Sequence, residues 1–190
     1  VMEHGMNAST FTARVIASTH AGVVASVVGA IGALKGPLHG GAPGPVLDML
    51  DAIAAHGDAE AWLAGELAAG RRLMGFGHRI YRVRDPRADV LKGVVSRLRT
   101  GEATERLAFA EGVEAAARRA LAAHKPGRPL DTNVEFYTAL LLEAVGLDRA
   151  LFTPVFAMGR VVGWTAHAFE QVRDGRLMRP QSAYVGPAAN

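Results

Sequence analysis

Apolar residues recur along most of this chain at spacings of three and four, which is the pattern of helices that bury one face. Proline near a helix start and glycine beyond a helix end mark the boundaries of these segments. The marks predict helices that begin at Pro43, Ala59, Pro86, Thr104, Asp131 or Thr132, and Pro154, and that end at His56, Ala69, Gly101, His124, Val145 and Val172. Extended structure is expected only over residues 72–83 and 177–185, and neither has a partner long enough for a substantial sheet. An all-α protein with short turns is therefore predicted.

The segment Val15–Leu34 carries no formal charge over twenty residues, which is the length of a membrane-spanning helix. It is dominated by alanine, valine and glycine, and it contains polar residues such as Ser18, His20 and Ser26. Residues 19–22 also divide it into two stretches of about three turns each. We therefore expect two buried helices that pack through small residues, and no membrane partner.

The chain has 190 residues, of which 49% are hydrophobic and 21% are charged, so it can form one large domain or two small ones. It has no cysteine, which excludes a disulfide scaffold, a thiolate zinc site and a cysteine nucleophile. Glu3 and His4 stand where a cleavable signal would have a basic start and an apolar run. The expected compartment is therefore the cytoplasm.

The formal net charge of +3 comes from eighteen arginines and three lysines against eighteen acidic residues. Arginine recognises carboxylates and phosphates with two parallel hydrogen bonds. Acidic residues are interleaved with these arginines, and no nucleic-acid-binding motif occurs, so a nucleic-acid partner is not expected.

Four short segments concentrate polar groups that packing alone does not require. They are residues 3–10 (EHGMNAST), 36–42 (GPLHGGA), 75–79 (GFGHR) continuing to 85–87 (DPR), and 133–137 (NVEFY). Three of them place a histidine beside glycine, and the fourth places Glu135 among apolar residues. A carboxylate that is partly buried near imidazoles and arginines suits proton abstraction from a weak carbon acid. A zinc site is the alternative for the histidines, but no His pair at i and i+4 and no acidic ligand cluster accompanies them, so no metal is expected.

With these four segments, and with residues 159–164 (GRVVGW) and 179–180 (RP), the sequence resembles the citrate synthase family over its whole length. The resemblance implies an acyltransferase that condenses acetyl-CoA with oxaloacetate and water to citrate and CoA, through an enol. It implies that Glu135 removes a methyl proton, that His39 hydrogen-bonds the thioester oxygen, and that His78 polarises the keto oxygen of oxaloacetate. CoA is then part of a substrate, and no cofactor is implied.

The resemblance also implies two groups of binding residues. Oxaloacetate is expected to contact His4, Arg87, Arg160 and Arg179. CoA is expected to contact a loop formed by Arg71, Arg72, Leu73, Met74 and Gly75. In one respect the chain departs from the family, which usually has aspartate at the position of Glu135.

The family fold is all-α with two domains, so we expect a small domain over residues 40–140 and parts of a large domain over 1–39 and 141–190. Family members are about twice as long, and the N-terminal half of the large domain is expected to be missing here. A homodimer is implied, with Arg179 reaching the partner's site.

Two other functions stay open at this stage. The shared motifs also fit a 2-methylcitrate synthase or a citryl-CoA lyase, because the acyl-chain preference is not encoded in them. An alternative of another class is a non-catalytic fragment that binds CoA or mediates oligomerisation.

Overall fold

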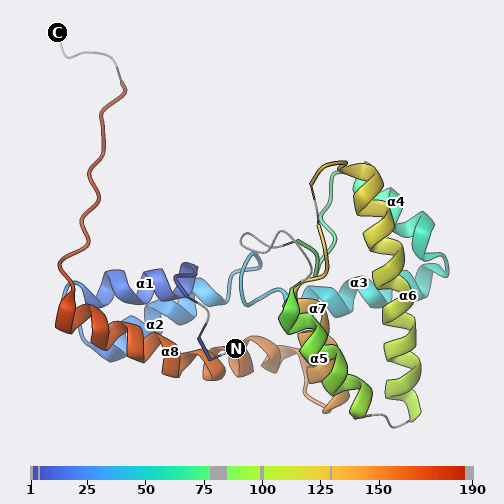
Figure 1. Cartoon of the computed structure of the whole chain (residues 1–190), viewed down its shortest axis with the longest axis horizontal. Coiled ribbons are helices and arrows are strands. Elements are labelled where there is room, and N and C mark those ends of the chain that lie inside the picture. The colour runs from blue at the N-terminus through green and yellow to red at the C-terminus, as the bar shows by residue number, and fades with distance from the viewer. Residues whose placement is uncertain (1, 4, 78–84, 99–100, 129, 187–190) are drawn as a thin grey trace. The chain divides into compact units, whose positions relative to one another are not determined.

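The computed structural model describes residues 2–3, 5–77, 85–98, 101–128 and 130–186. His4 and His78, two of the predicted site residues, lie outside these residues. Within them the chain forms eight α-helices, one 3₁₀ helix and an isolated β-bridge between Phe76 and Thr132 (Figure 1). The helices are α1 (Ala8–Ala17), α2 (Val23–Leu34), α3 (Pro43–His56), α4 (Ala59–Ala68), α5 (Pro86–Arg97), α6 (Gly101–His124), α7 (Val134–Ala144), η1 (Arg149–Leu151) and α8 (Phe152–Asp174). The prediction of an all-α protein is confirmed.

The chain divides into two compact units, each with its own interior. One comprises Val1–Leu34 together with Ala157–Asn190, and the other comprises Lys35–Phe156. The predicted domain boundaries after residues 39 and 140 concern the complete family fold, and they stay a prediction.

The unit Lys35–Phe156 has a continuous apolar core between its helices. Within it α7 packs against α3 and α5, and α4 packs against α6. The fully buried large side chains of this core are Val46, Leu47, Leu50, Ile53, Leu63, Val113, Phe136, Tyr137 and Phe152. Helix α7 contributes Phe136 and Tyr137 of its first turn to this core, directly after Glu135 in the chain.

The other unit is built on α1, α2 and most of α8. Helices α1 and α2 pack closely through small residues such as Ala13, Ala17 and Ala30. The indole Nε1 of Trp164 on α8 donates a 3.2 Å hydrogen bond to Ser9 Oγ on α1.

The expectation that both helices of the uncharged segment are buried is wrong for α2. Val24 is 74% exposed and Val28 is 63% exposed, and only Ser26, Ala30 and Leu34 of this helix are buried. Its apolar outer face is covered by no other element of the described chain. No helix among the described residues is both long and apolar enough to cross a membrane.

Helix α1 begins at Ala8, because Asn7 Oδ1 accepts a 3.0 Å hydrogen bond from the Thr10 amide. The predicted cap of α7 and the predicted end of α5 are corrected by the structure. Helix α7 is capped by Asn133 rather than by Asp131 or Thr132. Helix α5 ends at Arg97 instead of continuing to Gly101. The start of α4 is as predicted, since Asp58 Oδ1 accepts a 3.0 Å hydrogen bond from the Ala61 amide.

Candidate active site

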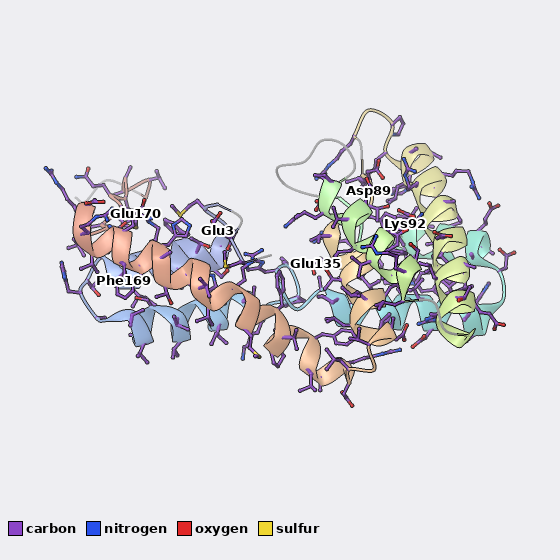
Figure 2. The ribbon with its side chains drawn as sticks, turned by 60° about the horizontal axis from the view of Figure 1, so that its bottom comes forward. Glu3, Asp89, Lys92, Glu135, Phe169 and Glu170 are labelled. Atoms are coloured by element: carbon purple, nitrogen blue, oxygen red, sulfur yellow. The ribbon has the colours of Figure 1, made fainter. Side chains whose placement is uncertain are left out.

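Glu135 lies in the first turn of α7, close to the backbone N–H groups at the N-terminus of this helix. The cap is Asn133, whose Oδ1 accepts a 3.0 Å hydrogen bond from the Glu135 amide. Its neighbours Val134, Phe136 and Tyr137 are buried. Glu135 itself, labelled in Figure 2, is half-buried, and its Oε2 is shielded from solvent. A helix N-terminus favours the ionised form of a carboxylate, which is the form that a general base requires.

The glycine-rich loop before residue 78 is joined to the segment that leads into α7. The Asn133 amide donates to the Gly75 carbonyl at 2.9 Å, and the Gly77 amide donates to the Asp131 carbonyl at 2.7 Å. Gly75 has φ +82°, and a Cβ at this position would lie 2.9 Å from Cβ of Phe136. Glycine is therefore required at residue 75 by both the backbone conformation and the close approach to α7.

Arg87 is held by Asp85, the buried N-cap of α5. Its Nε and Nη2 donate to Oδ1 and Oδ2 of Asp85 at 3.0 and 2.7 Å. Oδ2 of Asp85 also accepts a 3.1 Å hydrogen bond from the Val134 amide, so the same carboxylate ties Arg87 to the start of α7. Burial alone would raise the pKa of Asp85, but the hydrogen bonds from Arg87 and from the backbone hold this pKa below its usual value.

His39 lies in a tight turn between α2 and α3. Its amide donates to the Gly36 carbonyl at 2.9 Å, and its carbonyl accepts from the Ala42 amide at 3.3 Å. A Cβ at Gly41 would lie 2.6 Å from the Lys35 carbonyl oxygen. The glycines around His39 thus let the backbone fold back on itself and leave the imidazole half-buried.

The predicted CoA loop divides into buried and exposed residues. Leu73 is buried in the core and Met74 is partly buried, so these two side chains serve packing. Arg71 and Arg72 are exposed. Arg71 donates two hydrogen bonds of 2.7 and 2.6 Å to Glu66, and they lower the pKa of the Glu66 carboxyl.

The remaining predicted residues belong to the unit that contains α1, α2 and most of α8. Arg160 on α8 is 4% exposed, and its Nη1 lies in the interior. Arg179 is exposed in the segment after α8, one residue beyond Met178, whose amide donates to Ser18 Oγ at 3.1 Å. The expectation that Arg160 and Arg179 share one site with Glu135 stays a prediction.

Within the unit Lys35–Phe156, three predicted segments meet at residues 131–134. The loop with Gly75 pairs with this stretch through the backbone, Asp85 connects Arg87 to it, and Glu135 follows it directly. The arrangement brings the Glu135 carboxylate, the Arg87–Asp85 pair and the glycine loop to one place. Among the described residues, no group of three or more His, Asp or Glu is placed to hold a metal ion.

The sequence predicts no individual role for two residues of this region, Asp85 in the segment 85–87 and Glu114. Asp85 precedes Pro86, and this Asp-Pro pair is a signal for a helix N-cap. Glu114 on α6 is 5% exposed and lies in the helical stripe of buried residues Leu107, Ala110, Ala117 and Leu121. A glutamate within an apolar stripe is a signal for a buried carboxylate. A cavity of about 400 Å³ beside it is lined by Asp89, Lys92, Glu111, Glu114, Ala115 and Arg118, none of them a predicted site residue.

The helical architecture defines this chain as an all-α protein of the citrate synthase-like fold. Solved structures superimpose on its whole length, with TM-scores of 0.84 for citrate synthase of Thermotoga maritima (42% identical) and 0.89 for citrate synthase of Thermoplasma acidophilum (33% identical). The chain covers 51% and 50% of those two chains. The Thermoplasma structure is a ternary complex with carboxymethyl coenzyme A and oxaloacetate. Citryl-CoA lyase of Hydrogenobacter thermophilus gives a TM-score of 0.79 at 25% identity, and the chain covers 74% of it.

Sequence comparison gives the same assignment. The family profile described as citrate synthase, C-terminal domain, matches residues 1–181, so the chain belongs to the citrate synthase family. The chain is 51% identical over 185 residues to putative citrate synthase 2 of Mycobacterium tuberculosis, and 42% identical over 184 residues to 2-methylcitrate synthase of the same species. These matches cover 97% of this chain but 48% and 45% of the two relatives. The chain thus spans about half the length of the curated relatives that it matches.

Proposed function

We propose that this protein condenses acetyl-CoA with oxaloacetate and water to give citrate and CoA. The observation that carries the proposal is the meeting of three segments at residues 131–134. The Gly75 loop and the Arg87–Asp85 pair are hydrogen-bonded to this stretch, and Glu135 follows it directly in the chain. Membership of the citrate synthase family supports the same reaction.

Proton removal is the first step of the proposed mechanism. The methyl group of a thioester is a weak acid, so its anion has to be avoided by proton transfer at two positions. In this proposal the Glu135 carboxylate takes a methyl proton while an imidazole N–H of His39, hydrogen-bonded to the thioester oxygen, transfers its proton to that oxygen. The product of the step is the enol of acetyl-CoA.

Carbon–carbon bond formation follows. The enol carbon attacks the keto carbon of oxaloacetate, and the enol O–H proton returns to His39 as the thioester carbonyl forms again. His78 donates a proton to the keto oxygen, which becomes a hydroxyl. Water then attacks the thioester carbonyl of citryl-CoA, which breaks the C–S bond and releases citrate and the CoA thiol. The two carboxylates of oxaloacetate suit the forked donors of Arg87, Arg160 and Arg179 together with His4.

The Asp85–Arg87 pair supports an anion-binding role for Arg87. Asp85 uses the Nε and Nη2 donors of the guanidinium, which fixes its plane. An arginine that is oriented in this way can bind a substrate carboxylate with little loss of side-chain entropy.

Condensation of propionyl-CoA to 2-methylcitrate is the second candidate function. It is favoured by the relative named 2-methylcitrate synthase, which is as similar to this chain as several relatives named citrate synthase. Both reactions use the same base and the same dicarboxylate site, and they differ by one methyl group on the enol carbon.

Release of free CoA thiol distinguishes these functions. The protein is mixed with acetyl-CoA or with propionyl-CoA, each with and without oxaloacetate, and the thiol is followed by absorbance. Faster release from acetyl-CoA that depends on oxaloacetate supports the proposal, and faster release from propionyl-CoA supports 2-methylcitrate synthesis. Citryl-CoA cleavage without net thiol release would indicate a lyase. No reaction by a folded protein that binds CoA would indicate a non-catalytic module.

We further propose that the working unit is a homodimer in which Arg179 serves the partner's site. The exposure of Arg179 in the segment after α8 supports this arrangement. Mixing an inactive Glu135→Gln chain with an inactive Arg179→Ala chain tests it, because hybrid dimers would regain one complete site. An unchanged, inactive mixture of chains that exchange subunits would refute the proposal.

A further inference from the structure

Glu114 is a buried carboxylate that accepts hydrogen bonds from two hydroxyl groups of the α7 region. Thr132 Oγ1 donates to Oε1 at 2.6 Å, and Tyr137 Oη donates to Oε2 at 2.6 Å. Lys92 Nζ on α5 lies 3.8 Å from Oε2 and 5.6 Å from the centroid of the Tyr137 ring (Figure 2). A carboxylate with short hydrogen bonds and a nearby ammonium group makes a strong connection in a poorly solvated place.

The two donors stand on either side of Glu135 in the sequence. Thr132 precedes it by three residues and Tyr137 follows it by two. Glu114 therefore fixes the chain both before and after the N-cap Asn133. Because Glu135 lies between these two attachments, its backbone has little freedom to rotate about the axis of α7.

Thr132 also contacts the other two segments of the site through its backbone. Its carbonyl accepts a 3.2 Å hydrogen bond from the Asp85 amide, and it forms the β-bridge with Phe76. The side chain of one glutamate on α6 thereby braces the segment at which the base, the arginine pair and the glycine loop meet.

Glu111 offers a contrast one turn earlier on α6. It contacts the same lysine, with Nζ of Lys92 at 3.0 Å, but it is partly exposed and reaches neither Thr132 nor Tyr137 among the described contacts. The two glutamates share charge, helix and lysine partner, and they differ in their connection to α7.

We propose that Glu114 is a positioning residue which, through Thr132 and Tyr137, directs the Glu135 carboxylate toward the substrate methyl group. The inference rests on the proposed function of Glu135 as the base. It adds to that function a residue that touches no substrate and acts only through the geometry of α7. Misplacement of a reacting group by about 1 Å can reduce a rate by about a hundredfold, so a brace of this kind matters for turnover.

Steady-state kinetics of four variants test the proposal. Glu114→Met keeps the length of the side chain and removes both acceptors, and we expect kcat to fall by about 10- to 100-fold with the KM for oxaloacetate changed less than about threefold. Glu114→Gln keeps one acceptor and is expected to recover part of the loss. Glu111→Gln is the charge control, and Val113→Ala removes two methyl groups from the adjacent buried position as the stability control. Both controls are expected to keep kcat within about twofold of the wild type.

The outcomes separate positioning from stability and from failure of the proposed function. If Val113→Ala, at an equal loss of Tm, lowers kcat as much as Glu114→Met, or if folded Glu114→Met keeps full kcat, the proposal is wrong. Hydrogen exchange of the peptide 131–138 gives a readout that needs no activity. It is expected to rise selectively in Glu114→Met and not in Val113→Ala. If the wild type releases no thiol, the proposed function is wrong. If hydrogen exchange of the peptide 131–138 is the same in Glu114→Met as in the wild type, the proposed positioning role of Glu114 is wrong.

Discussion

Gly163, in the motif at residues 159–164, lies directly against the backbone of the N-terminal segment. A Cβ at this position would overlap the carbonyl oxygen of Met2 and would lie 3.4 Å from Cα of Glu3. The N-terminal segment therefore crosses α8 where only a hydrogen atom separates the two backbones. Glu3 is also held by Nε2 of His167, one turn later on α8, at 2.9 Å from its Oε1.

We expect Gly163→Ala to detach this N-terminal segment. The added methyl group cannot fit under the Met2 carbonyl, so the segment has to move away and become accessible to solvent. The matched control is Gly112→Ala on α6, where a Cβ would meet nothing within 4 Å. That substitution is expected to stabilise the protein by about 0.5–1 kcal/mol through helix propensity. Hydrogen exchange of residues 2–10 measures the detachment, and equal protection in both variants would contradict it.

Residues of the site differ in how far the sequence reveals them. Glu135 is recognisable because a charge between apolar residues is unexpected, and Gly75 because glycine recurs beside a histidine. Glu114 escapes notice because α6 also carries many solvent-exposed charges, and only a plot of its buried stripe separates this glutamate from the others. The partners of Asp85 cannot be derived from sequence, since its contact with Val134 joins residues that are far apart in the chain.

At the scale of elements, one carboxylate serves the start of two helices. Asp85 is the N-cap of α5, with Oδ1 accepting from the Arg87 amide at 3.0 Å, and its Oδ2 accepts from the first turn of α7. Asp85 is 1% exposed, so these hydrogen bonds are shielded from solvent. The relation between α5 and α7 therefore depends on the ionised form of Asp85.

Acid is expected to weaken this connection. Because the folded-state pKa of Asp85 lies below its ordinary value of 3.8, the unfolded chain binds the proton more readily. The stabilisation is fully present above the ordinary pKa and is lost as the pH falls through the folded pKa. The free energy of unfolding of the wild type is thus expected to exceed that of the Asp85→Asn variant by a constant amount near neutral pH. This difference between the two proteins is expected to shrink below about pH 4. Urea unfolding at a series of pH values measures it, and a difference that is independent of pH would contradict the account.

Both ends of α3 are predictable because a proline and a glycine mark them, whereas Gly101 does not end α5 and instead begins α6. Gly57 adopts φ +80° directly after α3, and Pro43 opens the same helix, as the sequence indicates. The cap of α7 was placed one or two residues early because Asp131, Thr132 and Asn133 are all good N-caps, and only the tertiary pairing with Gly75 selects Asn133.

At the scale of the whole molecule, the outer face of α2 is the main departure from the expected burial. Val24, Val28 and Ile31 lie on this face and are exposed. The sequence correctly predicts that α2 is apolar, but it does not show which surface packs against the outer face of this helix. Contiguous exposed apolar surface of this kind promotes association between protein molecules.

The chain is therefore expected to associate through α2 as its concentration rises. Analytical ultracentrifugation should give a mass above the 20.0 kDa of a single chain. Val28→Glu places a charge in the middle of this face and is expected to shift the mass toward the single chain. Ala122→Glu introduces the same charge at an exposed position of α6 and is expected to have no effect. A wild type that stays at the mass of a single chain at all concentrations would refute the expectation.

Exchange of the methyl protons of acetyl-CoA with solvent deuterium tests the role of Glu135 most directly, because it detects enol formation without the later steps. Nuclear magnetic resonance follows the exchange with a dicarboxylate that resembles oxaloacetate but cannot condense. In Glu135→Gln we predict that exchange and thiol release both fall by about 10²- to 10⁴-fold, while the Kd of oxaloacetate by calorimetry stays near that of the wild type. Exchange by this variant at the rate of the wild type would contradict the assignment of the base.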